Sequence, residues 1–178
     1  MKTILPFSLA FLCLLFIYSC SDNEFENTSV EGVNLDLSGE IVYACPSCLI
    51  TDENDPSNSY GRIDSISQYG FGVYYTLPDS LKDCTLKLIL TGKMRETESI
   101  SGYLAVALHS TDSIYHWGYV FSEHHLKELN KWGEFKDSVI IPRQANKPSS
   151  RLLKIFQFKT TGKGAYDVDQ LNVKIIRQ

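Results

Sequence analysis

The segment Thr85–Lys93 alternates between apolar and polar residues, which restricts what it can fold into. Its leucines fall on one side of an extended chain and its threonines and lysines on the other, with Ile89 as the exception. Successive side chains of a strand point to opposite faces, so this period of two predicts a strand with one buried face. Half-buried strands are typical of antiparallel sheets. The segment therefore favours an antiparallel β fold.

Comparable segments recur along the chain. The only helical candidate is Ser122–Asn130, about two turns long, with Ser122 as its N-cap. The segment Thr161–Gly164 predicts a hairpin turn between the last two strands. About nine strands with one short helix predict an all-β sandwich or barrel. We expect strands at Glu40–Ala44, Arg62–Ser67, Tyr69–Thr76, Thr85–Lys93, Tyr103–His109, Ser113–Phe121, Trp132–Ile141, Arg151–Thr160 and Ala165–Ile176.

The first 19 residues have the pattern of a targeting segment. Lys2 supplies a positive start, Ile4–Tyr18 supplies an apolar core, and the small residue Ser19 precedes Cys20. This order is typical of a secretory signal peptide, and the apolar core is shorter than the ~20 residues of a membrane span. Removing residues 1–19 from the 178-residue chain leaves 159, which suits one domain with its own core.

The four residues Ile17-Tyr18-Ser19-Cys20 resemble a bacterial lipobox, in which the cysteine is lipidated. The resemblance implies that Cys20 is the first mature residue and carries fatty-acyl chains, such as palmitate, that anchor the protein to a membrane. Residues 20–34 would then be a flexible acidic tether, and residues 35–178 the folded domain. The alternatives are an uncleaved anchor or an ordinary signal peptide.

Two further resemblances concern location. Ser21–Glu26 resembles the acidic export tag of surface lipoproteins of the Bacteroidota, although a solvated linker has the same composition. Together with the lipobox it implies a lipid-anchored outer-membrane protein that faces the cell surface; a periplasm-facing anchor is the alternative. Four tripeptides resemble the O-glycosylation signal of that phylum: Asp64-Ser65-Ile66, Asp79-Ser80-Leu81, Asp112-Ser113-Ile114 and Asp137-Ser138-Val139.

Three cysteines remain beyond Cys20, at Cys45, Cys48 and Cys84. The Cys45–Cys48 spacing suits redox or metal chemistry, but residues 49–60 predict a loop instead of the helix that a thioredoxin-type site requires. A zinc site would need a second pair. We expect a disulfide formed in an oxidising compartment, either within the pair or from one of its members to Cys84.

The chain has 17 basic and 21 acidic residues, a net charge of −4, and no basic run, so we expect no nucleic-acid partner. Its last third resembles jelly-roll domains of the carbohydrate-binding-module and galactose-binding-like kind. The resemblance covers residues 84–178 and implies two antiparallel sheets about 10 Å apart. The residues that carry it are Trp132, Phe135, Ser138–Pro142, Leu153–Phe158 and Tyr166–Leu171.

Alternate positions of Ser113–Phe121 are aromatic, and they are spaced by about 6.6 Å along a strand. A row of flat rings can stack on an extended chain of sugars. Sugar-binding jelly rolls use such a face, which implies glycan-binding roles for Tyr115, Trp117 and Tyr119. The alternative is that these rings form the core, because the opposite side carries a histidine and a glycine. Trp132 is expected to be buried.

The carboxylates Asp167 and Asp169 resemble the acidic pair of the final strand in these domains. In relatives one such carboxylate and a glutamate near the first strand hold a structural calcium, which implies Asp169 and Glu40 as ligands. Val168 separates the two aspartates, whereas the family pair is often adjacent. The alternative is a pair of exposed carboxylates at a sheet edge.

No motif for catalysis is present: the chain lacks a Gly-x-Ser-x-Gly elbow, His-Glu-x-x-His and a phosphate loop. Glycosidase carboxylates meet only in the fold, so Glu96, Glu98, Glu123 and Glu134 stay candidates. The sequence therefore predicts a non-catalytic, lipid-anchored binding module for a glycan. The alternatives are an accessory lipoprotein that docks on another envelope protein and a small glycoside hydrolase.

Overall fold

The protein, seen in a computed structural model, is described at residues 28–30, 33–36, 41–64, 67–110, 113–160 and 163–178. Sheet A is seven-stranded and contains β1 (Thr28–Val30), β2 (Val33–Asp36), β4 (Leu49–Thr51), β5 (Ser59–Ile63), β7 (Leu86–Glu96), β10 (Gly133–Ile141) and β12 (Tyr166–Arg177). Sheet B is five-stranded and contains β3 (Ile41–Ala44), β6 (Tyr69–Thr76), β8 (Gly102–His109), β9 (Ile114–Phe121) and β11 (Leu152–Lys159).

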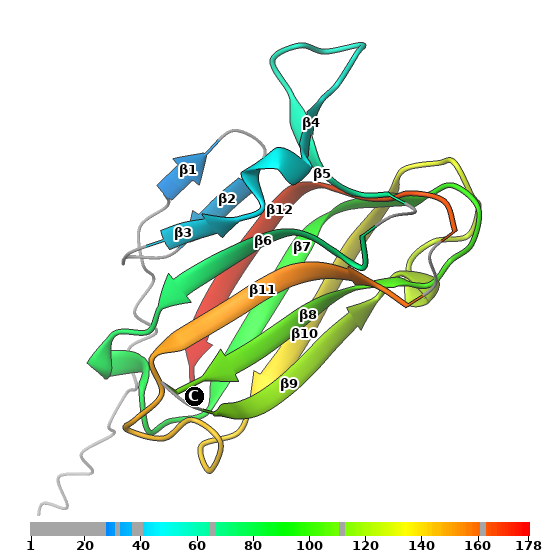
Figure 1. Cartoon of the computed structure of the whole chain (residues 1–178). Helices are drawn as coiled ribbons and strands as arrows, with labels where there is room; N and C mark the ends of the chain where they lie inside the picture. Colours follow the sequence, from blue (N-terminus) through cyan, green and yellow to red (C-terminus); the bar gives the residue numbers. More distant parts are fainter. Residues whose placement is uncertain (1–27, 31–32, 37–40, 65–66, 111–112, 161–162) are drawn as a thin grey trace, which may run out of the picture.

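The two sheets lie one behind the other, and the β4–β5 loop projects from one end (Figure 1). In sheet A the long strand β12 pairs with β7, which in turn pairs with β10. The other side of β12 pairs with β5 and, in parallel, with β2. Sheet B has the order β3-β6-β11-β8-β9, and all of its pairings are antiparallel. The predicted all-β sandwich of two antiparallel sheets is confirmed, apart from the parallel pairing of β2 with β12.

The core lies between the sheets and is built from the alternating faces of the strands. The leucines of β7 that the alternation assigned to the buried face are fully buried. They face Leu104, Val106 and Leu108 of β8 in a single hydrophobic cluster. Burial of apolar surface contributes about 25 cal/mol per Å², so this interleaved core supplies the main drive for the two sheets to pack.

The predicted helix over Ser122–Asn130 is shorter in the structure. It is a single 3-10 turn, η3 (Ser122–His124), followed by irregular chain. Ser122 does not cap it, because the buried Ser122 hydroxyl donates to the Glu96 carboxylate instead. Leu126 is buried but Leu129 is exposed, so the two leucines do not share a packed side.

The predicted hairpin at Thr161–Gly164 is wrong. β11 belongs to sheet B and β12 to sheet A, so the chain between them passes from one sheet to the other. Each strand keeps one face on the core, which is why the alternation alone did not distinguish a hairpin from a crossing.

The N-terminal part differs in detail from the prediction. The tether expected at residues 20–34 contains β1 and the first two residues of β2. The loop expected at residues 49–60 follows η1 (Pro46–Cys48) and contains β4 and the first two residues of β5. The leader and Cys20 lie outside the described residues. In the part of the chain that is described, no helix has the length and apolar character needed to span a membrane.

Candidate functional site

Aromatic rings from four strands cover the outer face of sheet B. The inward positions of the same strands carry the core residues, among them Leu104, Val120 and Ile155. The exposed fraction is 59% for Tyr69, 42% for Trp117 and 43% for Tyr119, which is high because Trp is highly buried on average and Tyr is intermediate. We call this surface the aromatic face; its rings are Tyr69, Tyr103, Trp117, Tyr119, Phe121, Phe156 and Phe158.

Strand register brings these rings into one connected layer. Tyr103 of β8 is paired with Phe121 of β9 on one side and with Phe158 of β11 on the other. Its ring centroid lies 5.5 Å from that of Phe121 and 5.0 Å from that of Phe158. The rings of Trp117 and Tyr119 are nearly parallel, with 5° between their planes and 6.3 Å between their centroids. Trp117 and Tyr119 thus present two parallel, partly exposed rings side by side along β9.

Small residues form the floor of the aromatic face. Ala105 lies between Tyr119 and Phe156 in the register, and Ala107 lies between Trp117 and Lys154. Both alanines are fully buried beneath their neighbours. The short side chain of Ala105 lines a depression of about 100 Å³ among the rings. It lies beside a cavity of about 510 Å³ with which it shares Tyr69, Trp117 and Phe156, so the surface is grooved.

The alternative that the β9 rings form the core is wrong, and Gly118 shows why. A Cβ atom at Gly118 would lie 2.2 Å from Cγ1 of Val139 in β10. The glycine therefore lets β9 approach the opposite sheet closely, and it belongs to the inner side of the strand together with the buried Val120. His116, also on that side, is half-buried, and burial lowers its pKa.

Tyr115 is separate from the other rings of its strand. The register between β8 and β9 shifts at Leu108/His109. The Tyr115 hydroxyl is 3.0 Å from Ser149 Oγ, and Lys147 Nζ lies 4.7 Å from the centre of its ring. Of the three ring residues that the sequence selected, Trp117 and Tyr119 lie together on the aromatic face and Tyr115 packs against the loop after β10.

Four rings of the aromatic face were missed by the sequence analysis: Tyr69, Tyr103, Phe156 and Phe158. They come from three other strands, and sheet pairing alone brings them to Trp117. The alternation in β11 carries a signal, since Phe156 and Phe158 fall on one side and Leu153 and Ile155 on the other. Both sides are apolar, so the sequence did not show which one is exposed.

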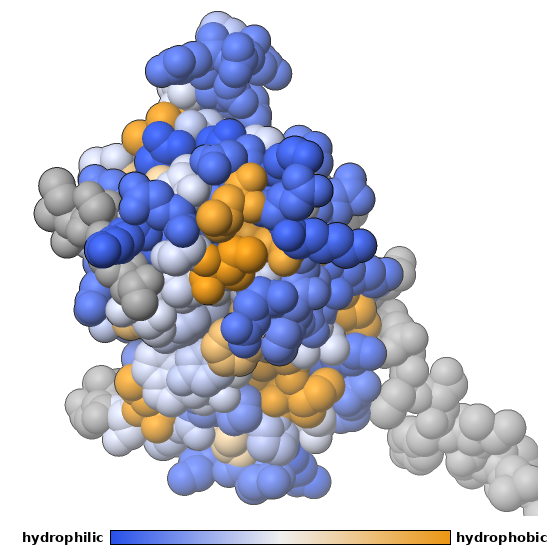
Figure 2. Space-filling model, turned by 90° about the vertical axis from the view of Figure 1, so that its right-hand side faces the viewer, coloured by the Kyte–Doolittle hydropathy of each residue, from blue (hydrophilic) through white to orange (hydrophobic). Residues whose placement is uncertain are grey.

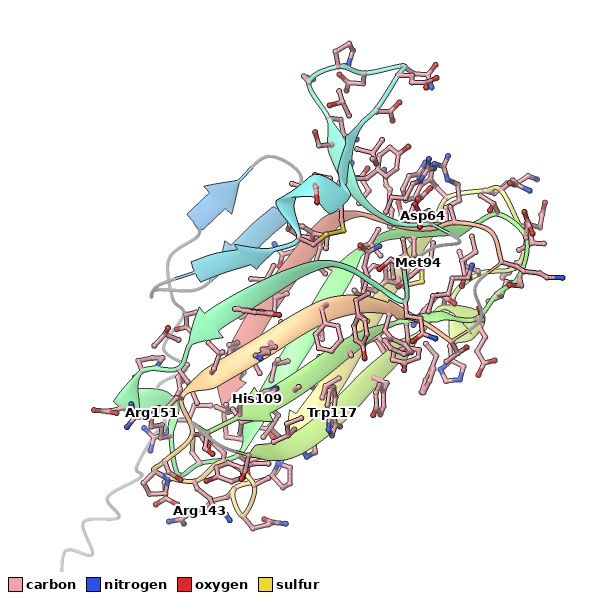
Figure 3. The ribbon with its side chains drawn as sticks, in the orientation of Figure 1. Asp64, Met94, His109, Trp117, Arg143 and Arg151 are labelled. Atoms are coloured by element: carbon pink, nitrogen blue, oxygen red, sulfur yellow. A yellow bond between two sulfur atoms is a disulfide. The ribbon has the colours of Figure 1, made fainter. Side chains whose placement is uncertain are left out.

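The larger cavity lies at the β6 and β11 side of the aromatic face, where Trp117 and His109 stand on neighbouring strands (Figure 3). Lys154 also lines it, with Nζ 4.8 Å from the centre of the Tyr74 ring. Burial, and secondarily the charge of Lys154, lower the pKa of His109. Nε2 of His109 is buried and has no hydrogen-bond partner among the described residues.

The cysteines form a local disulfide between Cys45 and Cys48, the first of the two predicted pairings. Cys45 is at the rim of the larger cavity. Cys84 is a buried free thiol whose Sγ is 3.4 Å from the carbonyl oxygen of Leu81, and burial raises its pKa. Neither arrangement presents a reactive thiolate.

The alternative of exposed edge carboxylates is wrong for Asp167 and Asp169, because both are buried in the central strand β12. Arg62 and Arg95 both donate to the Asp167 carboxylate, at 2.7 Å and 2.6 Å, and this contact raises the pKa of Arg62. The negative charge of Asp167 is thus already balanced by two guanidinium groups. Trp132, expected to be buried, is half-buried under the Arg95 guanidinium at 4.5 Å.

The described residues do not by themselves fit a calcium site. Asp169 accepts hydrogen bonds from Asn58 Nδ2 at 3.1 Å and from the backbone N–H of Gln170 at 2.7 Å. No group of three or more acidic, histidine or cysteine side chains suited to a metal occurs in the described part of the chain. Glu40 lies outside the described residues, so its pairing with Asp169 stays a prediction.

No protein-family model matches the chain, and no curated protein matches it. Similar solved structures include the CBM22-2 xylan-binding domain of Xyn10C from Paenibacillus barcinonensis, at 11% identity and TM-score 0.44, covering 79% of this chain and 88% of that one. The xylan-binding module CBM15 has 9% identity and TM-score 0.42, covering 79% and 97%. The enzymatically active domain of tailspike protein 4 of bacteriophage CBA120 has 9% identity and TM-score 0.45, covering 84% and 19%. Likeness at this level carries no argument about ligand or site.

Proposed function

We propose that the protein is a non-catalytic module that binds a glycan on the aromatic face. The observation that carries this proposal is the exposure of Trp117 and Tyr119, whose ring planes are nearly parallel. Exposed rings cost free energy in water, and a flat ring presents an amphipathic surface on which the apolar face of a sugar can stack. The depression lined by Ala105 would guide a chain of sugars across the strands.

The arrangement of charges argues against hydrolysis at this surface. Glycoside hydrolysis requires two carboxylates on either side of the scissile bond. Within the described residues, no Asp or Glu lines either of the two hollows that contain Trp117. Among the glutamates that the sequence left open, Glu96 is fully buried beside Lys159. A small glycoside hydrolase is therefore the weaker alternative.

The accessory-lipoprotein alternative would require an apolar docking patch away from the aromatic face. Large exposed apolar residues elsewhere in the described part of the chain include Ile114, Leu129 and Ile140, which belong to different segments. In the side view, apolar residues form separate patches among polar ones, and the projecting β4–β5 loop is hydrophilic (Figure 2). This distribution favours the aromatic face as the binding surface.

We also propose that the protein is lipid-anchored to the outer membrane through Cys20 and faces the cell surface. The lipobox-like Ile17–Cys20 and the acidic residues that follow support this proposal. Ser80, Ser113 and Ser138 of the four glycosylation-like tripeptides are exposed, as modification would require. Ser65, in the remaining tripeptide Asp64-Ser65-Ile66, lies outside the described residues.

The binding proposal is tested with Trp117→Ala on a polysaccharide array and by calorimetry with the best ligand. Truncating a central aromatic anchor costs about 2 kcal/mol or more, so we expect about a thirtyfold loss of affinity. Ile140→Ala, an exposed apolar residue of β10 in the other sheet, is the matched control and should bind like the wild type. Absence of any glycan binding, or equal binding by both variants, would refute the proposal.

A further inference from the structure

The larger cavity beside the aromatic face combines rings with a single positive charge. Its volume is about 510 Å³, and its lining includes the rings of Tyr74, Trp117 and Phe156. Lys154 is the only Lys or Arg among the described residues that line it, and none of those residues is Asp or Glu. A cavity of this size accommodates one or two sugar rings, so an occupant would meet both the rings and the ammonium group.

Lys154 has no carboxylate partner among the described residues. Lys82, Lys131 and Lys159 each form an ion pair, whereas Nζ of Lys154 lies over the face of the Tyr74 ring, 4.8 Å from its centre. Lys154 is half-buried on β11, between the rows of β6 and β8. A partly desolvated cation attracts an anion more strongly than one in bulk water does, because the local dielectric is lower.

The other end of the aromatic face has the opposite character. A hollow of about 300 Å³ there is lined by Tyr103, Phe121 and Glu123, with no Lys or Arg among its described lining residues. The Glu123 carboxylate is 3.8 Å from His124 and largely exposed. A ligand lying along the groove therefore passes from a cationic end to an acidic end, and an anionic group on it would be accepted only near Lys154.

We propose that the cavity at Lys154 is a subsite for an anionic sugar, whose carboxylate or sulfate group binds Lys154 Nζ while its ring packs against Trp117. This inference rests on the proposed function and narrows the ligand to an acidic glycan. A charge-assisted hydrogen bond to an ammonium group is stronger than a neutral one, which would give selectivity over the uncharged chain.

The test uses the full chain, purified in a detergent without sugar head groups, and an array in which each polysaccharide backbone is present neutral, carboxylated at C6 and sulfated at C6. We expect tighter binding of one anionic form than of its neutral counterpart, with the two anionic arms showing whether carboxylate or sulfate is preferred. Lys154→Gln should lose about tenfold or more in affinity for that form and leave the neutral chain unaffected.

Lys136→Gln, which removes the same charge from an exposed position of β10 in sheet A, is the matched control. Removing one positive charge weakens the long-range attraction of acidic polymers equally in both variants. This part of the effect should fall with added salt. Equal binding of neutral and anionic forms by the wild type, or equal losses in the two variants, would overturn the subsite while leaving glycan binding intact. Failure to bind any form would refute the proposed function itself, and the subsite with it.

Discussion

At the scale of single residues, Gly118 decides which side of β9 is exposed. The inner side of the strand must pass close to Val139 of β10, and only a residue without a side chain fits there. The alternate positions, Trp117 and Tyr119, are consequently on the outside. Because Gly118 faces the core, the aromatic residues on either side of it lie on the outer surface of sheet B.

Replacing Gly118 with alanine should destabilise the protein by about 1–3 kcal/mol, the usual cost of overpacking a core. The added Cβ would lie 2.2 Å from a methyl group of Val139, a stiff β-branched side chain that cannot rotate away freely. The free energy of unfolding in urea measures the effect. Val139→Ala removes the methyl group that the new Cβ would meet. In a Val139→Ala background, Gly118→Ala should therefore cost much less stability than it does in the wild type. An unchanged stability of Gly118→Ala would contradict this account of β9.

His109 provides a second residue-scale prediction. Burial and the nearby Lys154 lower its pKa, so the imidazole should titrate below its ordinary value of 6.5 in an NMR titration. Lys154→Gln removes the charge and should raise the pKa of His109 part of the way back. His116 is the internal control: burial also lowers its pKa, but Lys154 is not among the causes.

The same two histidines make stability depend on pH. In the unfolded chain they bind protons near pH 6.5, whereas in the folded protein they do so only at lower pH. The unfolded state therefore binds more protons as the pH falls below about 6.5, and their contribution to stability is lost in that direction. If Lys154→Gln changed the pKa of His116 as much as the pKa of His109, the local action of Lys154 on His109 would be contradicted.

At the scale of elements, a buried ion pair ties β7 to β11 across the sandwich. The Lys159 Nζ is 3.1 Å from the Glu96 carboxylate, and both side chains are almost completely buried. The same carboxylate accepts the backbone N–H groups of Ser101 and Gly102, so it also anchors the chain between β7 and β8. The turn that begins β8, and with it Tyr103, is positioned from inside the protein.

Replacing Lys159 with methionine should cost about 3–5 kcal/mol of stability, because it leaves the Glu96 carboxylate buried without its cation. Lys131→Met is the matched control: Lys131 pairs with Glu128 at the surface, where such pairs contribute about 0–1 kcal/mol. Thermal or urea unfolding distinguishes the two. A similar small loss in both variants would show that Glu96 is adequately held by the Ser122 hydroxyl and its backbone donors.

Strand positions were predictable because burial on one face leaves an alternation in the sequence, as in β7 and β8. Sheet membership was not, since β11 and β12 show the same alternation whether they form a hairpin or lie in different sheets. The same holds for the candidate site: positions along one strand were predictable, and pairing between strands was not. Trp117 and Tyr119 stand out along one strand, whereas Phe156 joins them only through pairing of β11 with β8.

At the scale of the whole molecule, the two sheets have different outer faces. The aromatic face of sheet B is open to a ligand, whereas the outer side of β12 is covered around Asp167 by Arg62 and Arg95. Tyr60 and Trp132 stack on Arg95 there, at 5.6 Å and 4.5 Å. Under the proposed function, an attachment at one end of the chain would leave the aromatic face free to meet its ligand.

The proposed attachment point is Cys20, and its chemistry gives the last prediction. Cells grown with a labelled fatty acid should incorporate label into the wild-type chain, and the protein should sediment with membranes. Cys20→Ser removes the acceptor thiol, so both the label and stable membrane association should be lost, because stable anchoring takes more than one acyl chain. Cys84→Ser, which alters a buried thiol of the folded domain, should keep both. Membrane association of Cys20→Ser without label would indicate an uncleaved leader as the anchor instead.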